Sequence, residues 1–459
     1  MRITDVESHS IRPTYQDFNN HTLQRYHGPL IQRRTIYVLH TDTGLQGIGE
    51  SVGHGHDEDT LRDKCVGSDP FDGVNAHTDL GLNMATYDLM GKHLGLPAWK
   101  LMGPKVRSWI PVSAWTVSQE PAAMAEEVRQ AAARGYRWMK YHVDEVQNVV
   151  DQAEAMQAAA PPWFKIHYDF NANSDYYTMR PILARLEAFS VSGRFEDVVR
   201  ASDEDGWRML REQCRLPVIV HHGPPEFMIK GLVDGYMAGH APIGSGLKLA
   251  GVAELTDTPI MYQQAGGTIN QAFLAHEVAV VRMATIDHVN LCHLWKEDVT
   301  TQTMPVIGGS VQVPVGPGLG IELDRDRLER CQVPITDPPP SLVRIRHAGG
   351  PTIYLRYDPG LPGHQDDMRY YERLHQFGVP GPPPSYVNEV ITDFWEGDDD
   401  PAAFGPAGTI GIGGKALTAA IGGLRTQAAH LHKDGRGGHG LYPASQSKVA
   451  LAMSQSAAR

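Results

Sequence analysis

The sequence predicts a (β/α)7-8 TIM-type barrel that follows an N-terminal α+β capping domain, and three observations indicate this architecture. Strand-like and helix-like stretches alternate from about residue 110 to about residue 294, at a spacing of roughly 25 residues that is typical of parallel β/α units. The residues before them show a hairpin pattern and then a helical one. Polar residues gather at the ends of the predicted barrel strands, where barrel enzymes keep their working residues.

The capping domain is predicted to span residues 1–110. Alternating and β-rich stretches predict strands over 3–11, 34–40 and 45–50, and apolar residues at helical spacing predict helical structure over 79–101. The turn between the second and third strands ends in Gly44, which can adopt the positive φ that hairpin turns require.

The barrel is predicted to span residues 111–330. No GxGxxG motif follows a predicted strand and opens a helix, so a dinucleotide-binding fold gains no support. The predicted strands cover residues 112–116, 138–143, 164–169, 195–197, 217–222, 235–240, 259–263 and 289–294. The intervening helices are predicted over 122–134, 147–159, 179–188, 204–214, 225–232, 246–255 and 269–283.

The remaining residues differ in composition from the barrel. Residues 331–400 are rich in proline and are predicted to be an irregular segment that packs on the cap or the barrel, with one strand-like run at 352–357. Residues 401–459 are rich in glycine and alanine and poor in large apolar residues. This composition predicts a poorly ordered tail.

Composition and charge limit the kinds of partner. A hydrophobic fraction of 41% and a charged fraction of 20% are typical of a soluble globular protein. The net charge of −12 makes nucleic acid and anionic membranes unfavourable partners. No apolar stretch approaches the roughly 18 residues of a membrane span. The start lacks a secretory pattern and the four cysteines are widely separated, so we expect a cytoplasmic protein with reduced thiols.

Three side chains at the ends of successive predicted strands form a candidate metal site. Glu196 lies 27 positions after Asp169, and His222 lies 26 positions after Glu196, so each step is one β/α unit. Equal steps predict that the side chains stand at the same height on adjacent strands, about 4.8 Å apart, and converge on one cation. Two carboxylates suit Mg²⁺ or Mn²⁺. In the alternative interpretation, Asp169 and Glu196 cap loops or pair with arginine.

Several motifs around these residues resemble the enolase superfamily, in its mandelate racemase and muconate lactonizing enzyme branch. The resemblance covers roughly residues 1–330, and its most specific part is the helical stretch 87–103, YDLMGKHLGLPAWKLMG. The other matching segments are Gly47-Ile-Gly-Glu50, Lys140-Tyr-His142, Asp169-Phe-Asn171, Phe195-Glu-Asp197 and the stretch 316–323, GPGLGIEL.

The resemblance implies a reaction, a cofactor and a substrate class. Members of the family remove the proton α to a carboxylate and hold the resulting enediolate on Mg²⁺. We therefore expect one divalent metal, a small-molecule carboxylate substrate and a homo-oligomer. His222, or its neighbour His221, stands where the family has a third acidic ligand. Because nitrogen ligands favour later metals, Mn²⁺, Fe²⁺ or Zn²⁺ can replace Mg²⁺.

Lys140, His142 and His240 are the predicted catalytic residues. Lys140 is the natural base, because a metal and neighbouring cations would lower its pKa towards neutrality. His142 replaces the second lysine of the family's pair and can act as a base or a hydrogen-bond donor. His240 follows the sixth barrel strand and is the predicted general acid, with an ordinary core or loop histidine as the alternative.

The predicted substrate contacts come from both domains. The resemblance implies that two cap loops close over the pocket, and the polar side chains in those loops are Tyr15, His27, His54 and His56. Asn171, Gln264 and Glu297 follow barrel strands and are the remaining predictions. For His54 and His56 a surface loop is the alternative, and for Glu297 a solvated charge at a helix start.

These residues favour a dehydratase acting on a sugar acid or a related hydroxy acid, because the predicted pocket is polar. A racemase, epimerase or cycloisomerase of the same superfamily is the first alternative. The family's His–Asp dyad is missing, since Tyr262-Gln-Gln264 stands where its histidine would be, and this disfavours a racemase built on that dyad. A non-catalytic descendant that binds a ligand or metal is the second alternative.

Overall fold

The computed structural model describes most of the first 332 residues and a few short strands beyond them. The described residues are 1–20, 22–23, 32–53, 55–75, 79–143, 148–171, 174–332, 342–347, 352–356, 390–395, 410–412 and 415–416. His27 and His54, both predicted substrate contacts, lie outside these ranges. In the described part of the chain, no helix is long and apolar enough to cross a membrane.

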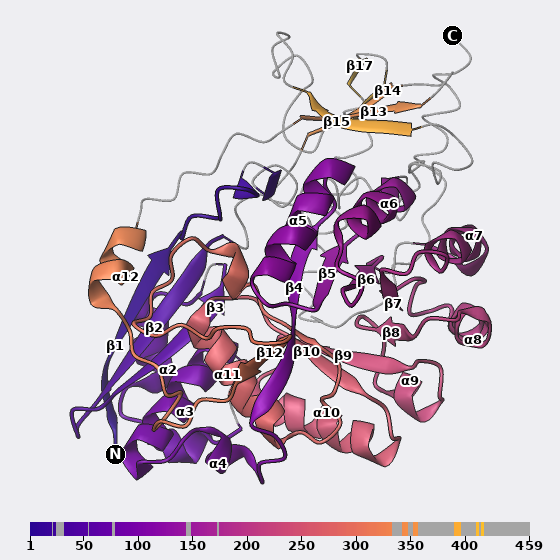
Figure 1. The fold of residues 1–459 in the computed structure, drawn as a ribbon. Coiled ribbons are helices and arrows are strands. Elements are labelled where there is room, and N and C mark those ends of the chain that lie inside the picture. The colour runs from indigo at the N-terminus through magenta and orange to yellow at the C-terminus, as the bar shows by residue number, and fades with distance from the viewer. Residues whose placement is uncertain are drawn as a thin grey trace.

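The amino-terminal unit is a three-stranded antiparallel sheet covered by helices, at the lower left of Figure 1. Its strands, in the order β1-β2-β3, are Ile3–Ile11, Arg34–Thr41 and Gln46–Val52. Its helices are α2 (Glu58–Cys65), η1 (Pro70–Gly73), α3 (Leu80–Leu94) and α4 (Trp99–Met102). Helix α3 lies so close to β3 that a Cβ at Gly49 would stand 1.9 Å from the carbonyl oxygen of Gly81, which explains the glycine.

The central unit is a closed barrel of eight parallel strands, because β11 pairs with β4 and completes the ring. The strands are β4 (Trp109–Val117), β5 (Trp138–His142), β6 (Lys165–Asp169), β7 (Ser192–Glu196), β8 (Val218–Val220), β9 (Gly235–Gly239), β10 (Ile260–Gln263) and β11 (His288–Val289). The helices are α5 (Pro121–Ala133), α6 (Val149–Ala159), α7 (Tyr176–Leu186), α8 (Glu204–Gln213), α9 (Glu226–Ile229), α10 (Ile243–Leu255) and α11 (Thr268–Val280), arranged around the strands (Figure 1). The predicted fold class is confirmed.

The strands separate two kinds of side chain. Tyr141, Tyr168 and Phe195 belong to the large apolar core shared with the helices. The neighbours that alternate with them are polar and point into the barrel, because successive residues of a strand face opposite sides. The polar barrel interior is therefore assembled from every second residue of β5, β6 and β7.

After the barrel, η3 (Cys292–Leu294), β12 (Ser310–Gln312) and α12 (Arg325–Cys331) follow, and β12 pairs antiparallel with β4. Five further strands form an antiparallel sheet in the order β15-β13-β14-β16-β17. They are β13 (Leu342–His347), β14 (Thr352–Arg356), β15 (Val390–Trp395), β16 (Ile410–Ile412) and β17 (Lys415–Ala416). The region after residue 331 therefore contains more regular structure than the single strand-like run expected there. Its proline content obscures β-strands that are short and pair across long stretches of sequence.

Candidate active site

Asp169 and Glu196 are direct register partners at the carboxyl ends of β6 and β7. Both side chains are buried, with exposed fractions of 1% and 0%. Burial opposes ionisation, but the charges of Lys140 and His142 hold the pKa of Asp169 below its usual value. Burial and the neighbouring Asp169 raise the pKa of Glu196 well above its usual value. The two carboxylates are thus at the same height, as their spacing predicts.

His222 is not at the height of this pair, and the expectation of three side chains at one level is wrong. Strand β8 ends at Val220, and the register partner of Glu196 on it is Ile219. The His222 ring hydrogen-bonds Asp197, while His221 Nδ1 lies 3.5 Å from Glu196 Oε1. Equal spacing in sequence failed here because helix and loop lengths vary, whereas backbone pairing sets the height.

Asp197 is part of the site, although the spacing argument passed over it. It is fully buried, and it accepts a hydrogen bond of 2.7 Å from the backbone N–H of His221. Asp169, Glu196 and Asp197 each offer an oxygen, and these atoms lie within 4.8 Å of one another. Asp197, His221 and His222 form a second such group. The adjacent acidic residues Glu196 and Asp197 are the feature of the sequence that could have identified Asp197 as a site residue.

Lys140 occupies the space between the carboxylates. Its Nζ lies 2.9 Å from Asp169 Oδ2 and 2.9 Å from Glu196 Oε1, and it donates to Gln263 Oε1 at 2.5 Å. Burial disfavours its positive charge, but the two carboxylates outweigh burial and raise the pKa of Lys140. The pKa therefore shifts in the direction opposite to the one expected for a base.

His142 and His240 come from opposite sides of the barrel. His142 is the last residue of β5, directly opposite Asp169 in register, and its Nε2 lies 3.3 Å from Asp169 Oδ2. His240 follows β9, which is four strands away from β5 in the ring of eight. Its side chain is exposed, yet the surrounding protein and the charges of Lys140 and His222 lower its pKa. This shift disfavours the protonated form that a general acid needs, and the general-acid role of His240 stays a prediction.

Three strand ends at this face adopt left-handed backbone conformations. The φ angles are 55° at Asn171, the second residue after β6, and 46° at Asp197 and 48° at His240, which directly follow β7 and β9. Such conformations are uncommon outside glycine and often accompany functional sites. Asn171, a predicted substrate contact, also donates its backbone N–H to Asp169 Oδ1 at 2.9 Å.

The other predicted substrate contacts are dispersed. Tyr15 is buried and stacks on Trp295, with ring centroids 5.1 Å apart, so the cap loop docks on the segment after β11. His56 contacts residues of the cap, with its Nε2 2.9 Å from Lys64 Nζ and 3.5 Å from Asp79 Oδ2.

Gln264 and Glu297 lack a recorded contact with the carboxylates among the described residues. Gln264 donates to Glu277 on helix α11 at 3.0 Å, and its neighbour Gln263 contacts Lys140 instead. Gln263, and not the predicted Gln264, therefore faces the barrel interior, because adjacent residues of a strand face opposite sides. Glu297 is exposed.

A second inward layer of basic residues lies beneath the carboxylates. Lys140 pairs in register with His167, and His167 pairs with Arg194. All three are buried, and burial together with the charges of Arg194 and Lys140 lowers the pKa of His167 well below its usual value. His167 and Arg194 were absent from the predicted site, although each precedes a predicted ligand by two residues and so faces the same way.

The carboxylates fit a divalent cation. Asp169 Oδ2 and Glu196 Oε2 are buried, and no well-directed hydrogen bond from the described residues reaches either oxygen, although cationic or imidazole nitrogens lie nearby. Buried oxygens with unused lone pairs are costly unless they bind something. Carboxylate oxygens are the ligands that Mg²⁺ and Mn²⁺ prefer.

Comparisons with known proteins agree with this geometry. Residues 123–327 match the family described as enolase C-terminal domain-like. The D-gluconate dehydratase of Thermoproteus tenax is 25% identical over 298 residues, which are 57% of this chain and 59% of that enzyme, less than two thirds of its length. The D-galactonate dehydratase of Xanthomonas oryzae pv. oryzae (strain PXO99A) is 22% identical over 358 residues, 67% of this chain and 93% of that enzyme.

Solved structures share the fold. A mandelate racemase/muconate lactonizing family protein from Azoarcus sp. EbN1 has a TM-score of 0.61 and 22% identity, over 73% of this chain and 99% of that chain. The N-succinyl Arg/Lys racemase from Bacillus cereus ATCC 14579 has a TM-score of 0.59 and 20% identity, over 72% and 98%. Together with the barrel and the motifs, these findings support membership in the enolase superfamily, in its mandelate racemase/muconate lactonizing enzyme-like branch, with the family match over residues 123–327.

Proposed function

We propose that this protein is a metal-dependent enzyme that removes the proton α to the carboxylate of a hydroxylated acid, and that it dehydrates a sugar acid. The observation that carries the proposal is the register pair Asp169 and Glu196, whose buried oxygens can accept a cation at the active face of the barrel. The relatives named as dehydratases of D-gluconate and D-galactonate support the substrate class.

We assign the metal to Asp169, Glu196 and Asp197, with His221, whose Nδ1 lies 3.5 Å from Glu196 Oε1, as a candidate nitrogen donor. A divalent ion there would supply Lewis-acid stabilisation of the negative charge that develops when the α-proton leaves. His222, whose ring hydrogen-bonds Asp197, would then orient a ligand rather than serve as one. These residues lie at, or directly after, the carboxyl ends of β6, β7 and β8.

His142 is the base in this proposal. Its ring lies at the mouth, beside Asp169, whereas Lys140 is buried beneath it and held as an ammonium. His142 accepts the α-proton, and the bond from the β-carbon to its hydroxyl then breaks. The hydroxide takes a proton and leaves as water, and the remaining enol tautomerises to a 2-keto acid. Protonated His142 is the better donor for that proton, since the lowered pKa of His240 leaves His240 neutral.

An epimerase is the second candidate, and one observation favours it. His142 and His240 belong to strands on opposite sides of the barrel, so a neutral His240 could remove the α-proton from one face and a protonated His142 could return a proton to the opposite face. Exchange of the α-hydrogen with solvent deuterium, without loss of water, would identify this reaction.

The test is a screen of aldonic and uronic acids with purified protein and Mg²⁺ or Mn²⁺. We expect at least one acid to yield a 2-keto acid, detected as its semicarbazone. His142→Ala should abolish the activity, and the surface variant Arg129→Ala should retain it, because Arg129 pairs with Glu126 on the solvent-exposed face of α5. Full activity in His142→Ala would contradict the assigned base. Absence of both metal binding and turnover would indicate a non-catalytic descendant in which Lys140 takes the place of the metal.

A further inference from the structure

The basic layer beneath the carboxylates contains a chain of contacts that ends on Glu196. Arg194 Nε donates to His167 Nδ1 at 3.1 Å, and His167 Nε2 lies 2.7 Å from Glu196 Oε2, a close contact that lacks the direction of a hydrogen bond. Arginine is always protonated and offers only donors, so His167 Nδ1 must be the acceptor. The neutral imidazole therefore carries its hydrogen on Nε2, on the side of Glu196.

Arg194 is itself held from three directions. Its Nη2 donates to Asp287 Oδ2 at 3.0 Å, its guanidinium lies 3.7 Å from the centre of the Trp138 ring, and Nε is committed to His167. The side chain is 8% exposed. A planar donor fixed on an aromatic face has little freedom, so it holds the His167 ring in one orientation.

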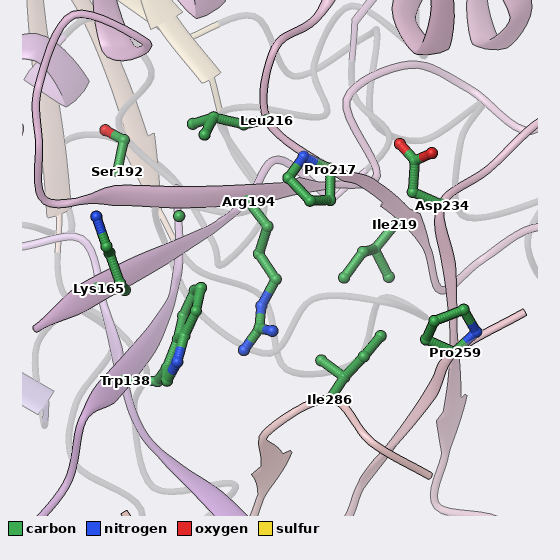
Figure 2. Close-up of a pocket in the computed structure, with 11 residues that line it drawn as sticks. Trp138, Lys165, Ser192, Arg194, Leu216, Pro217, Ile219, Asp234, Pro259 and Ile286 are labelled. Carbon is green, nitrogen blue, oxygen red and sulfur yellow. The ribbon is translucent and has the colours of Figure 1, made fainter. Parts of the chain in front are cut away.

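The guanidinium is reached from the opposite end of the barrel. A pocket of about 420 Å³ opens among the amino-terminal ends of β5 to β10, and its walls include Trp138, Arg194, Asp234 and Ile286. Figure 2 shows the Arg194 side chain extending between Trp138 and Ile286. The carboxylates lie at the carboxyl ends of the same strands. A small cation could therefore enter this pocket without passing the active face.

We propose that Arg194 and His167 are positioning residues that fix the tautomer and ring orientation of His167 and thereby orient Glu196 for the metal. This inference rests on the proposed metal site. It gives residues at the amino-terminal end of the barrel a role in orienting a metal ligand at the carboxyl-terminal end. Outer groups that orient a ligand commonly change metal affinity although they never touch the ion.

Arg194→Ala tests the inference by chemical rescue. We expect Mn²⁺ affinity, measured by calorimetry and by the paramagnetic resonance of bound Mn²⁺, to fall by about 10- to 100-fold, as for other outer groups of metal sites. Millimolar guanidinium chloride should enter the vacated pocket and restore most of the loss, while sodium chloride at the same ionic strength should not. A merely structural role of Arg194 would not respond to guanidinium.

Matched variants complete the test. Arg211→Ala removes an arginine that pairs with Asp234 on the wall of the same pocket, and it should leave Mn²⁺ affinity unchanged. His167→Gln keeps a side-chain N–H donor and should bind Mn²⁺ better than His167→Leu. If Arg194→Ala fails to fold, the Mn²⁺ affinities of the two His167 variants still test whether a donor at this position orients Glu196.

The outcomes separate the inference from the proposed function. Loss of Mn²⁺ binding in Asp169→Asn supports the metal site. If Arg194→Ala then binds Mn²⁺ as the wild type does, or loses binding that guanidinium does not restore, the role of Arg194 is overturned and the metal site still stands. Equal affinities of His167→Gln and His167→Leu overturn the role of His167. A wild-type protein that binds no Mn²⁺ overturns both the metal site and the inference.

Discussion

Asp169 and Glu196 face each other in register across β6 and β7, and Lys140 Nζ lies 2.9 Å from an oxygen of each. Two buried carboxylates so close together need a cation between or beside them. In this chain the candidates are the Lys140 ammonium and a divalent metal, and several measurements distinguish their roles.

Replacing either carboxylate by its amide should remove metal binding. We expect Asp169→Asn and Glu196→Gln to weaken Mn²⁺ binding by about 100-fold or more, since even outer groups contribute about 10- to 100-fold. Calorimetry measures the affinity, and circular dichroism checks the fold. Glu126→Gln, on the exposed face of α5, is the control. Unchanged Mn²⁺ affinity in both amide variants would show that the cation binds elsewhere.

Removing Lys140 should destabilise the protein and make it more responsive to metal. Lys140→Met leaves two buried carboxylates without their ammonium, and breaking a buried pair costs about 3–5 kcal/mol. Urea unfolding measures the free energy of unfolding. Added Mn²⁺ should stabilise this variant more than the wild type, because the ion no longer competes with Lys140. If Mn²⁺ stabilises Lys140→Met less than it stabilises the wild type, Mn²⁺ and Lys140 do not compete for the two carboxylates.

The third metal ligand can be identified by comparing three neighbouring residues. We expect Asp197→Asn and His221→Ala to weaken Mn²⁺ binding more than His222→Ala does. Asp197 groups with Asp169 and Glu196, and His221 is 3.5 Å from Glu196, whereas the His222 ring is directed at Asp197. Calorimetry gives the Mn²⁺ affinity of each variant. If His222→Ala weakens binding most, His222 is the third ligand, as its spacing in the sequence predicts.

A buried ion pair within the cap sheet, Arg34 with Glu50, also contacts residues of the barrel unit. Arg34 on β2 donates to Glu50 Oε1 at 2.5 Å and lies 4.8 Å from the Trp295 ring, and Glu50 accepts the backbone N–H of Gly267 at 2.8 Å. Arg34→Met leaves Glu50 buried without its partner and should lower the free energy of unfolding by about 3–5 kcal/mol.

The exposed pair of Arg62 and Asp5 is the matched control for Arg34. Arg62→Ala should change stability by less than about 1 kcal/mol, because water screens the pair. Urea unfolding of both variants makes the comparison. Similar small losses in the two would mean that the buried Arg34 pair stabilises the fold no more than the exposed pair does.

Acid should weaken the contact between α12 and the cap sheet. Partial burial disfavours the charge of Glu7, but hydrogen bonds from Arg325, His9 and His40 outweigh it and lower the pKa of Glu7 to about 2. Because the folded pKa is depressed, the stabilisation is present above the unfolded pKa of about 4.3 and is lost as pH falls towards 2. Solvent screening limits it to about 1 kcal/mol.

Glu7→Gln isolates this contribution. Wild type and variant should differ in free energy of unfolding at pH 6, differ less at pH 3 and converge only as the pH falls to about 2 and below, in urea titrations at fixed ionic strength. A difference that persists unchanged at the lower pH would assign the stabilisation to packing rather than to the charge of Glu7.

The sequence by itself determined the periodic features of this protein. Repeated β/α units predict the barrel, because each strand is buried on both of its faces and each helix on one. The positions of Asp169 and Glu196 followed from strand ends and from motifs, because the carboxyl ends of parallel strands meet at one face. Whether this pair binds a metal remains a prediction.

Only the tertiary structure decided the contacts within that face. The register of β8 placed Ile219, not His222, opposite Glu196, and strand alternation turned Gln263 inward and Gln264 outward. The layer formed by Lys140, His167 and Arg194 became visible only when the strands were aligned. Sequence spacing counts residues along helices and loops of unequal length. Hydrogen bonds between strands, which set the height of each side chain, depend on which strands are neighbours in the closed barrel.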